Sequence, residues 1–367
     1  MMNILFIGKR FNTNRDALTE KFGRIYQLPL HLSKEQDIKI KLWLIDYHSS
    51  KRIKNTDNNL KIISTPVRTG AVFYQYIKES IEREKYDLVI ASGDCYIGLL
   101  GYILAISHKA KFIFDVYDKY DEFSGYIKPL GFDLFGFLLK KADMRFFASH
   151  TLLQELGQPQ YDTILSNGID AKHFRAIDKT EARTKLQLSL TQTFVGYFGS
   201  MESDRGVQDL IDAVKILRQQ GHDIVLLLGG RSDPNLDLDQ LGIHYLGNVL
   251  FRQVPYALAA CDVLAIPHRR SAFLDAAAPN KIGEAMMMHR PIVATRSPNL
   301  FANFPKQAAS LEPYLARPRS PESLASAIAK QLKDGFLVNK PSYMYWNEIT
   351  LKVKGKINKL LTSQVEL

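Results

Sequence analysis

The amino-acid sequence predicts an α/β protein built from two domains. The chain has 367 residues, which is long for a single core and ample for two. Its composition, 46% hydrophobic and 23% charged, is typical of a soluble globular protein rather than a disordered one. Along both halves, short apolar segments bounded by turn residues alternate with segments of helical period. This pattern indicates strand–helix–strand units and therefore parallel sheets.

The first half begins with an apolar strand, Asn3 to Ile7, that ends at Gly8. Gly8 thus stands at a strand's carboxyl end, where an α/β sheet opens its ligand crevice. The residues after it lack Gly-x-Gly-x-x-Gly, which counts against a dehydrogenase. A helix is expected from about Asn14 until Pro29 interrupts it. Further strands are expected at 38–44, 60–64, 87–92, 111–116 and 142–149, with helices at 72–83 and from Ser149.

Carboxylates follow the strand at 111–116, which ends in Asp115-Val116-Tyr117-Asp118. Side chains at the carboxyl end of a parallel strand lie where α/β enzymes place their chemistry. Asp118 is therefore a candidate functional residue. The alternative, that the aspartates only cap a loop, stays open.

The second half begins with a strand at 194–198, followed by the loop Gly199-Ser200-Met201-Glu202-Ser203-Asp204-Arg205-Gly206. A helix follows, with apolar residues at helical spacing from Val207 to Leu217, and Gly221 closes it. Further strands are expected at 224–228, 244–249, 263–266 and 292–295. Helices are expected at 254–260, beginning at Pro321, and near the end of the chain, where the last helix ends at Leu361.

A loop and helix between two of these strands form the most informative stretch. Pro279-Asn280-Lys281 opens a helix that carries Glu284. A helix N-terminus presents unpaired N–H groups and a positive dipole end, so it suits an anion such as phosphate. Lys281 adds a cation, and Glu284 is placed to accept hydrogen bonds from a sugar diol. The alternative is an ordinary strand–helix–strand unit whose Lys281 and Glu284 are solvated.

These segments resemble the family 4, or group 1, retaining glycosyltransferases, which have two Rossmann-like domains facing across a cleft (the GT-B type). The chain matches the family element Pro-x-Lys-x-x-Glu at 279–284 and continues with Arg290-Pro291-Ile292-Val293-Ala294-Thr295. The family's Gly-Arg-x-x-x-x-(Lys/Arg)-Gly element is matched by Gly199, Arg205 and Gly206. Residues 166–174 resemble the segment that ends the family's first domain.

The resemblance implies a particular domain organisation. Residues 1–174 would form an acceptor-binding domain, 175–192 a linker, and 193–344 the nucleotide-sugar-binding domain. The C-terminal helix, about 345–367, is expected to cross back to the first domain.

The resemblance also implies chemistry: transfer of a sugar from a nucleotide diphosphate, UDP- or GDP-linked, with retention and without a metal or other cofactor. The acceptor would be a glycan, a lipid-linked molecule or a small molecule. Asp118, Arg205 and Lys281 would take the catalytic roles, the two cations by stabilising charge on the leaving diphosphate. The donor would contact Gly8, Gly199, Ser200, Arg205, Leu246, Asp275, Pro279, Asn280, Lys281, Ile282 and Glu284.

Three departures from the family pattern affect this prediction. Ser200 replaces one of the two basic residues that bind the donor diphosphate in the family, and Tyr117 stands in place of a histidine. Ala276 occupies the first position of the family's Glu-x7-Glu pair, with Asp275 beside it as a substitute. Two other functions therefore stay open: a nucleotide-sugar epimerase on the same fold, and a non-catalytic subunit that binds a sugar nucleotide.

The net charge of +10 is spread evenly over the chain, with no basic tail, so no nucleic-acid partner is expected. A local excess of cations near Trp43, at 39–54, is a candidate contact with anionic membrane, and a solvated surface is the alternative.

Two cysteines fit a reducing compartment. The apolar stretch 88–106 is broken by Ser92-Gly93-Asp94 and is expected to be a strand and a core helix. We therefore expect a cytoplasmic protein with no signal peptide and no transmembrane helix, with membrane association left open.

Overall fold

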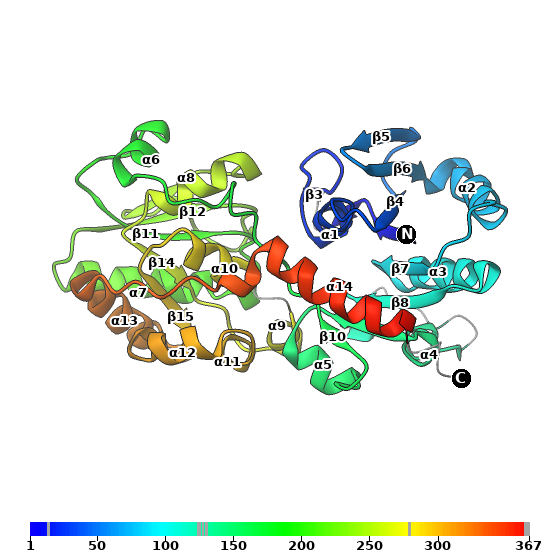
Figure 1. Cartoon of the computed structure of the whole chain (residues 1–367). Coiled ribbons are helices and arrows are strands. Elements are labelled where there is room, and N and C mark those ends of the chain that lie inside the picture. The colour runs from blue at the N-terminus through cyan, green and yellow to red at the C-terminus, as the bar shows by residue number, and fades with distance from the viewer. Residues whose placement is uncertain (13–14, 123–125, 127, 129–130, 278–279, 363–367) are drawn as a thin grey trace. The chain divides into compact units, whose positions relative to one another are not determined.

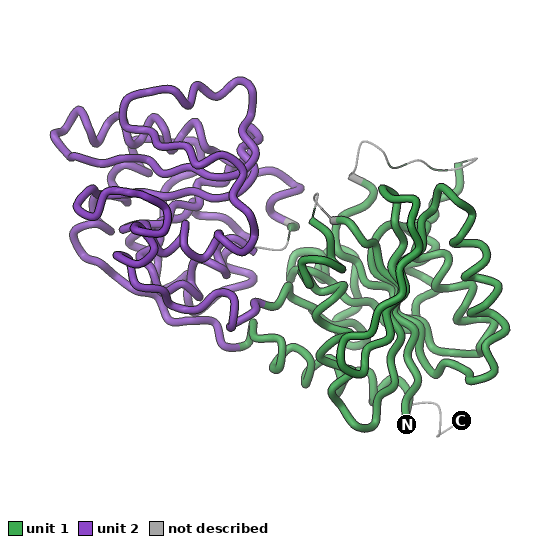
Figure 2. Tube along the Cα trace, turned by 90° about the horizontal axis from the view of Figure 1, so that it is seen from above, with its two compact units in different colours: residues 1–168, 276–278, 343–367 green, residues 169–275, 279–342 purple. Residues whose placement is uncertain are grey.

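A computed structural model of the chain describes residues 1–12, 15–122, 126, 128, 131–277 and 280–362 (Figure 1). The chain divides into two compact units (Figure 2). Unit 1 comprises residues 1–168, 276–278 and 343–367, and unit 2 comprises 169–275 and 279–342. Each unit is an α/β domain with its own sheet.

The sheet of unit 1 has the strand order β10-β9-β8-β7-β1-β4-β6-β5 among the described residues. Its neighbouring strands are parallel, except that the edge strand β5 pairs antiparallel with β6. The strands are β1 (Met2–Lys9), β4 (Ile38–Asp46), β5 (Ile53–Asp57), β6 (Leu60–Pro66), β7 (Leu88–Ser92), β8 (Lys111–Val116), β9 (Met144–Phe147) and β10 (Thr163–Ile164).

Helices cover both faces of this sheet, because alternate residues of each buried strand are apolar on both sides. On one face α1 (Arg24–Leu32) packs beside α14 (Trp346–Thr362). The C-terminal helix therefore belongs to unit 1; Lys354 Nζ anchors it to Glu35 and Asp37, at 2.7 Å from each. The other face carries α2 (Ala71–Ser80), α3 (Cys95–His108) and α4 (Leu134–Lys141), and α5 (His150–Leu156) follows β9.

The sheet of unit 2 is parallel throughout its described strands, in the order β13-β12-β11-β14-β15-β16. Its strands are β11 (Thr193–Phe198), β12 (Ile224–Gly229), β13 (Ile243–Tyr245), β14 (Val263–Ile266), β15 (Ile292–Thr295) and β16 (Leu315–Ala316). Its helices are α6 (Lys179–Lys185), α7 (Val207–Gln219), α8 (Val254–Ala259), α9 (Ala272–Ala276), α10 (Asn280–Met287), α11 (Pro298–Asn303), α12 (Pro305–Leu311) and α13 (Pro321–Asp334). Two such parallel-sheet domains confirm the predicted fold class.

The start of the chain differs from the prediction. Asn14 lies outside the described residues, and no helix begins within the described residues 15–23; instead β2 (Phe11–Asn12) and β3 (Arg15–Asp16) form a short antiparallel pair. Arg10 closes this loop, with Nε 2.9 Å and Nη2 2.7 Å from the Asp16 carboxylate. The helix α1 begins only at Arg24, and Pro29 lies inside it rather than ending it.

The structure does not place Trp43 on the candidate membrane face at 39–54, although Lys51, Arg52 and Lys54 of that stretch are exposed. Trp43 is fully buried and its indole N–H donates to Thr65 Oγ1 at 2.8 Å. Lys39 is paired with Glu84, and Lys41 lies 2.9 Å from Glu79. The alternation of this segment predicts the strand but not its surroundings, since β4 is a central strand with both faces covered. The stretch 88–106 does divide into β7 and α3, and no described helix is both long enough and apolar enough to cross a membrane.

Candidate functional site

The strand order of unit 2 fixes where a ligand can bind. The chain runs from β11 outward to β12 and β13, and then returns to the other side of β11 with β14 and β15. In parallel sheets this reversal leaves a crevice at the carboxyl ends of the two strands that flank it. Here those ends are Phe198-Gly199 on β11 and Ile266-Pro267 on β14. The predicted Gly199, Arg205 and Lys281 all belong to segments that meet this edge.

Lys281 lies directly over Gly199. A Cβ atom at residue 199 would overlap Lys281 Cε and come within 2.9 Å of its Nζ. Gly199 also has φ +147°, which a residue with a side chain adopts only with strain. The glycine therefore lets the lysine stem cross the strand end, and the ammonium group is held where β11, β14 and the first turn of α10 come together.

The ammonium group of Lys281 is poorly solvated. Burial and, to a lesser degree, the nearby Arg205 lower the pKa of Lys281 to about 8, while Glu284 opposes the change. A buried cation beside another cation is unfavourable in the empty site. Both effects are relieved when an anion binds, so the pair Lys281 and Arg205 forms an anion-binding arrangement.

Arg205 is held by acidic neighbours. Its Nε lies 3.3 Å from Glu202 and 3.4 Å from Asp204. Glu202 also pairs with Arg231, at the end of β12, and it accepts a hydrogen bond from the Ser200 side chain. Ser200, predicted as a donor contact, is therefore engaged with Glu202. An incoming phosphate would compete with this carboxylate for the two guanidinium groups.

His268, in the loop after β14, adds a further polar group to this edge. Its Nε2 is buried and has no hydrogen-bond partner among the described residues, and its ring lies 6.3 Å from that of Tyr197, edge to face. Burial, with Lys281 and Arg205 nearby, lowers the pKa of His268 well below its usual value. A neutral imidazole with an unpaired nitrogen, beside two cations, is suited to hydrogen-bond a ligand.

The loops around this edge are fixed by close packing and ion pairs. Gly206 approaches Pro267 so closely that a Cβ would overlap the proline carbonyl oxygen. Arg269 binds Asp209 in the first turn of α7 with two hydrogen bonds, of 2.9 and 2.6 Å. Its backbone N–H also donates to Asp204 at 2.8 Å. The loops that carry Arg205 and His268 are thus tied together.

Glu284 lies one turn after Lys281 on α10. The two side chains line a small cavity, of about 20 Å³, whose other walls come from β11, β14 and α8. Ile282, which was also predicted to contact the donor, is buried in the core side of α10. Asn280 is the first residue of this helix, whereas Pro279 lies outside the described residues.

Two further predicted contacts lie at the periphery. The carboxylate of Asp275 is bound by Arg270, at 3.0 and 3.1 Å, so it is already neutralised. Leu246 follows β13, where its N–H donates to Leu228 at 2.8 Å. It does not line the cavity beside Lys281 and Glu284.

Gly8 and Asp118 belong to unit 1, at the equivalent edge of its sheet. The chain order reverses there between β1 and β7, and residues Gly8 and Ser92 are paired at their ends. Gly8 allows close packing, since a Cβ would overlap Ile25 of α1. Asp118 follows β8; burial raises the pKa of its carboxyl to about 6, with Asp115 adding to the shift and Arg24 opposing it.

A buried ion pair supports this edge. Arg24 Nη2 lies 2.6 Å from Asp115, both side chains are fully buried, and the guanidinium stacks 4.2 Å from the Tyr117 ring centroid. Tyr117 in turn accepts a hydrogen bond from Asn167 at 3.2 Å. Asp115 is therefore structural, whereas Asp118 keeps a strongly perturbed carboxyl, which is common at functional sites.

Within the described residues, no group of three or more histidine, cysteine or acidic side chains is arranged to hold a metal ion. One Asp-x-Asp pattern occurs, Asp237-Leu238-Asp239, in the loop between β12 and β13. There Asp237 accepts a hydrogen bond from the backbone N–H of Asp239 at 3.2 Å, as in a simple turn.

The structure thus brings Gly199, Ser200, Arg205, Lys281 and Glu284 to one edge of unit 2. Arg231 and His268 join them, and neither is among the donor contacts expected from the resemblance. One sequence feature could have indicated that Arg231 lies at this edge: the Gly229-Gly230 turn directly before it, at the end of a buried strand. Nothing in the local sequence indicated that His268 is buried.

Comparisons with known proteins agree with this arrangement. Residues 192–334 match the family model described as "Glycosyl transferases group 1". TuaC of Bacillus subtilis (strain 168), named as a teichuronic acid biosynthesis glycosyltransferase, is 26% identical over 186 residues, 50% of this chain. The match spans 45% of TuaC, so the chain covers less than half the length of this relative.

Two solved structures share the fold of the whole chain. Sucrose-phosphate synthase from Thermosynechococcus elongatus superposes with a TM-score of 0.70, at 16% identity, over 99% of this chain and 100% of that one. Anabaena HepE in complex with UDP and glucose gives 0.65 at 16% identity, over 98% and 100%. The family match therefore lies within unit 2, and the solved structures share the two-domain α/β fold.

Proposed function

We propose that the protein is a retaining glycosyltransferase that moves a sugar from a nucleotide diphosphate, UDP-linked in first preference and GDP-linked otherwise, to a glycan or lipid-linked acceptor without a metal. The observation that carries the proposal is the contact between Lys281 and Gly199 at the switch point of the unit 2 sheet. It holds a desolvated cation where a diphosphate would lie in such a fold.

The chemistry assigned to each residue follows from charge. When the sugar leaves, negative charge grows on the diphosphate, and Lys281 and Arg205 would stabilise it. Arg205 suits the task because its planar fork makes paired hydrogen bonds to phosphate oxygens. Glu284 would accept hydrogen bonds from the ribose, and His268 would bind a sugar or phosphate oxygen. Ser200 leaves this site with one cation fewer than the family pattern, and Arg231 is placed to supply it.

The preference for UDP and for a glycan acceptor draws on the relatives. HepE has been solved with UDP and glucose, and TuaC is named for the synthesis of teichuronic acid. Both facts concern those proteins, and they motivate the first donors and acceptors to test here. Asp118 is proposed to border the reacting sugar, as the resemblance implies.

A thermal-shift screen followed by a transfer assay tests the proposal. UDP or GDP should raise the melting temperature, since a ligand that binds only the folded state stabilises it by RT ln(1 + [L]/Kd), and NAD should not. Transfer or slow hydrolysis of a nucleotide sugar should follow. An epimerised donor would instead identify an epimerase, and binding without turnover for any donor and acceptor pair would identify a non-catalytic subunit. A shift with NAD alone would refute the nucleotide-sugar site.

A further inference from the structure

One face of unit 1 presents apolar side chains where a soluble helix normally carries charge. Phe73 and Ile77 on α2, and Ile81 directly after its last residue, follow one another at four-residue spacing and are 68%, 43% and 74% exposed. This spacing aligns the three side chains in a single ridge along the helix. Tyr74 and Lys78 flank the ridge and are also exposed.

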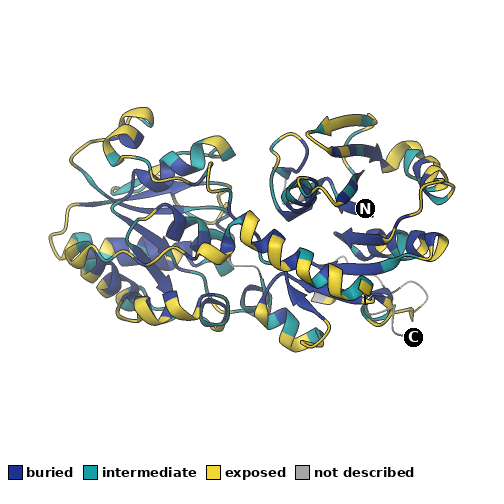
Figure 3. Ribbon diagram, viewed as in Figure 1, coloured by how far each residue is buried: buried dark blue, intermediate teal, exposed yellow. Residues whose placement is uncertain are grey.

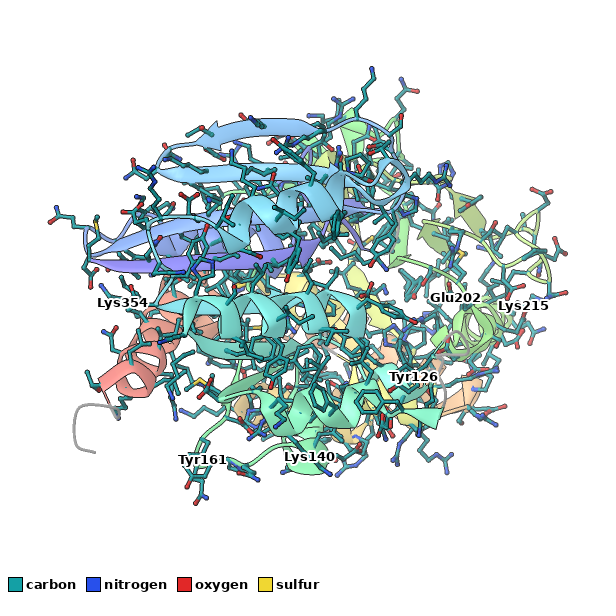
Figure 4. All side chains as sticks on the ribbon, turned by 90° about the vertical axis from the view of Figure 1, so that its right-hand side faces the viewer. Tyr126, Lys140, Tyr161, Glu202, Lys215 and Lys354 are labelled. Atoms are coloured by element: carbon teal, nitrogen blue, oxygen red, sulfur yellow. The ribbon has the colours of Figure 1, made fainter. Side chains whose placement is uncertain are left out.

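The neighbouring helix continues this apolar surface. α3 contains no Asp, Glu, Lys or Arg in its whole length, Cys95–His108. One side packs on the sheet, yet Tyr96, Ile103 and Ile106 on the outer side are exposed. A helix that is apolar on every side is normally covered on every side. Figure 3 shows exposed residues along both helices, and Figure 4 looks onto the two helices side by side.

The C-terminal ends of the two helices are joined. His108 at the end of α3 hydrogen-bonds through Nε2 to the Glu79 carbonyl on α2, at 2.8 Å. Exposed cations surround these ends: Lys78 on α2, Arg83 just after it, and Lys109 just after α3. The acidic residues nearby are neutralised within unit 1, since Lys41 binds Glu79 and Glu82.

We propose that this α2–α3 face, defined by Phe73, Ile77, Ile81, Ile103 and Ile106, docks on a bilayer that contains anionic phospholipid. Apolar and aromatic side chains would enter the boundary between headgroups and acyl chains, while Lys78, Arg83 and Lys109 meet the lipid phosphates. The charge pattern favours lipid over a second copy of the chain. Neither α2 nor α3 exposes an acidic side chain, so self-association would bring cations together without partners.

Vesicle flotation with the full-length protein tests this face independently of the sugar-nucleotide site. Vesicles of phosphatidylcholine with phosphatidylglycerol, three to one, should carry the protein upward, and phosphatidylcholine alone should carry much less. The double variant Phe73→Ser/Ile77→Ser should weaken binding at least about tenfold, because apolar burial is lost. Lys78→Ala should weaken it about fivefold.

The matched control is Leu351→Ser, which removes a side chain that is 61% exposed on α14, away from this face. It should float like the wild type. Each variant is checked by its melting temperature and by its thermal shift with UDP, neither of which should change. Equal flotation of the double variant and the control would overturn the proposal. Failure of the wild-type protein to bind either vesicle would also overturn it. If light scattering then detected a dimer that the double variant abolishes, the face would join two copies of the chain instead.

Discussion

The unusual ionisation of Lys281 gives the sharpest prediction: binding of UDP should take up a proton near pH 8. In the free protein the pKa of Lys281 is lowered to about 8 by burial and by Arg205. A diphosphate beside the ammonium group would return its pKa to the ordinary range or above it. Only the protonated lysine then binds well, so affinity must fall as the pH rises through 8.

The magnitude follows from that single ionisation. Protonated Lys281 makes up about nine-tenths of the free protein at pH 7 and about one-tenth at pH 9, so the Kd for UDP should rise about tenfold between them. At pH 8 about half a proton should be taken up for each UDP bound. The β-phosphate of UDP is already ionised over this range, since phosphate groups lose their second proton near pH 6.

Titration calorimetry in two buffers of different ionisation enthalpy measures both quantities. Lys281→Arg keeps a charge that does not titrate, so its proton uptake should vanish. Lys281→Met should weaken UDP binding about tenfold or more, because a hydrogen bond to a charged group is lost. Lys215→Met, which removes an exposed lysine on α7, serves as the control and should behave like the wild type. Proton uptake that persists in Lys281→Arg, or a Kd that does not change with pH, would refute the reasoning.

Four other predictions follow, three from the unit 2 site and one from Asp118 in unit 1. Gly199→Ala should abolish the thermal shift with UDP, because its methyl group occupies the place of Lys281 Cε; an unchanged shift would separate this glycine from the site. Glu202→Gln should bind UDP several-fold more tightly by releasing Arg205, and weaker binding would mean that Glu202 positions Arg205 instead. Glu284→Ala should remove most of the UDP shift, and a full shift would exclude Glu284 as a ribose contact. Asp118→Asn should gain up to about 3 kcal/mol of unfolding free energy at pH 8 and less than about 1 kcal/mol at pH 4, measured by urea unfolding of both proteins.

The sign of the Asp118 effect follows from its raised pKa. A folded-state pKa of about 6 lies above the unfolded value of 3.8, so the folded protein holds the proton more tightly. The cost of ionising the buried carboxyl is therefore absent at low pH, grows between pH 4 and 6, and is complete above 6. An asparagine side chain does not ionise and therefore avoids this cost. Equal stabilisation at both pH values would point to packing rather than charge.

Much of the fold was readable from the sequence because buried parallel strands are continuous apolar runs. The strands 111–116, 263–266 and 292–295 have the predicted bounds. The ends of strands also located the candidate site, since Gly199 and Lys281 both follow such runs. The prediction for the start of the chain was wrong because Arg10 binds Asp16 and holds the loop in place. Hydrophobic periodicity does not reveal such a side-chain pairing.

Side-chain environments were harder to predict than backbone elements. Burial of Trp43 and pairing of the nearby lysines depend on which strand lies at the sheet edge, and a local alternation does not reveal that. The stretch 95–108 was expected to be core, yet its outer side is exposed, because a run of apolar residues does not say how many of its sides are covered. The partners of Arg205 and Asp275 are likewise set by loop geometry.

A crystal structure with UDP bound tests the central claim most directly. Density for the diphosphate should lie within hydrogen-bond distance of Lys281 Nζ, beside Gly199 at the carboxyl end of β11, with Arg205 turned from Glu202 toward a phosphate oxygen. Density at another edge of either sheet, or a Lys281 side chain directed away from the bound diphosphate, would contradict the account.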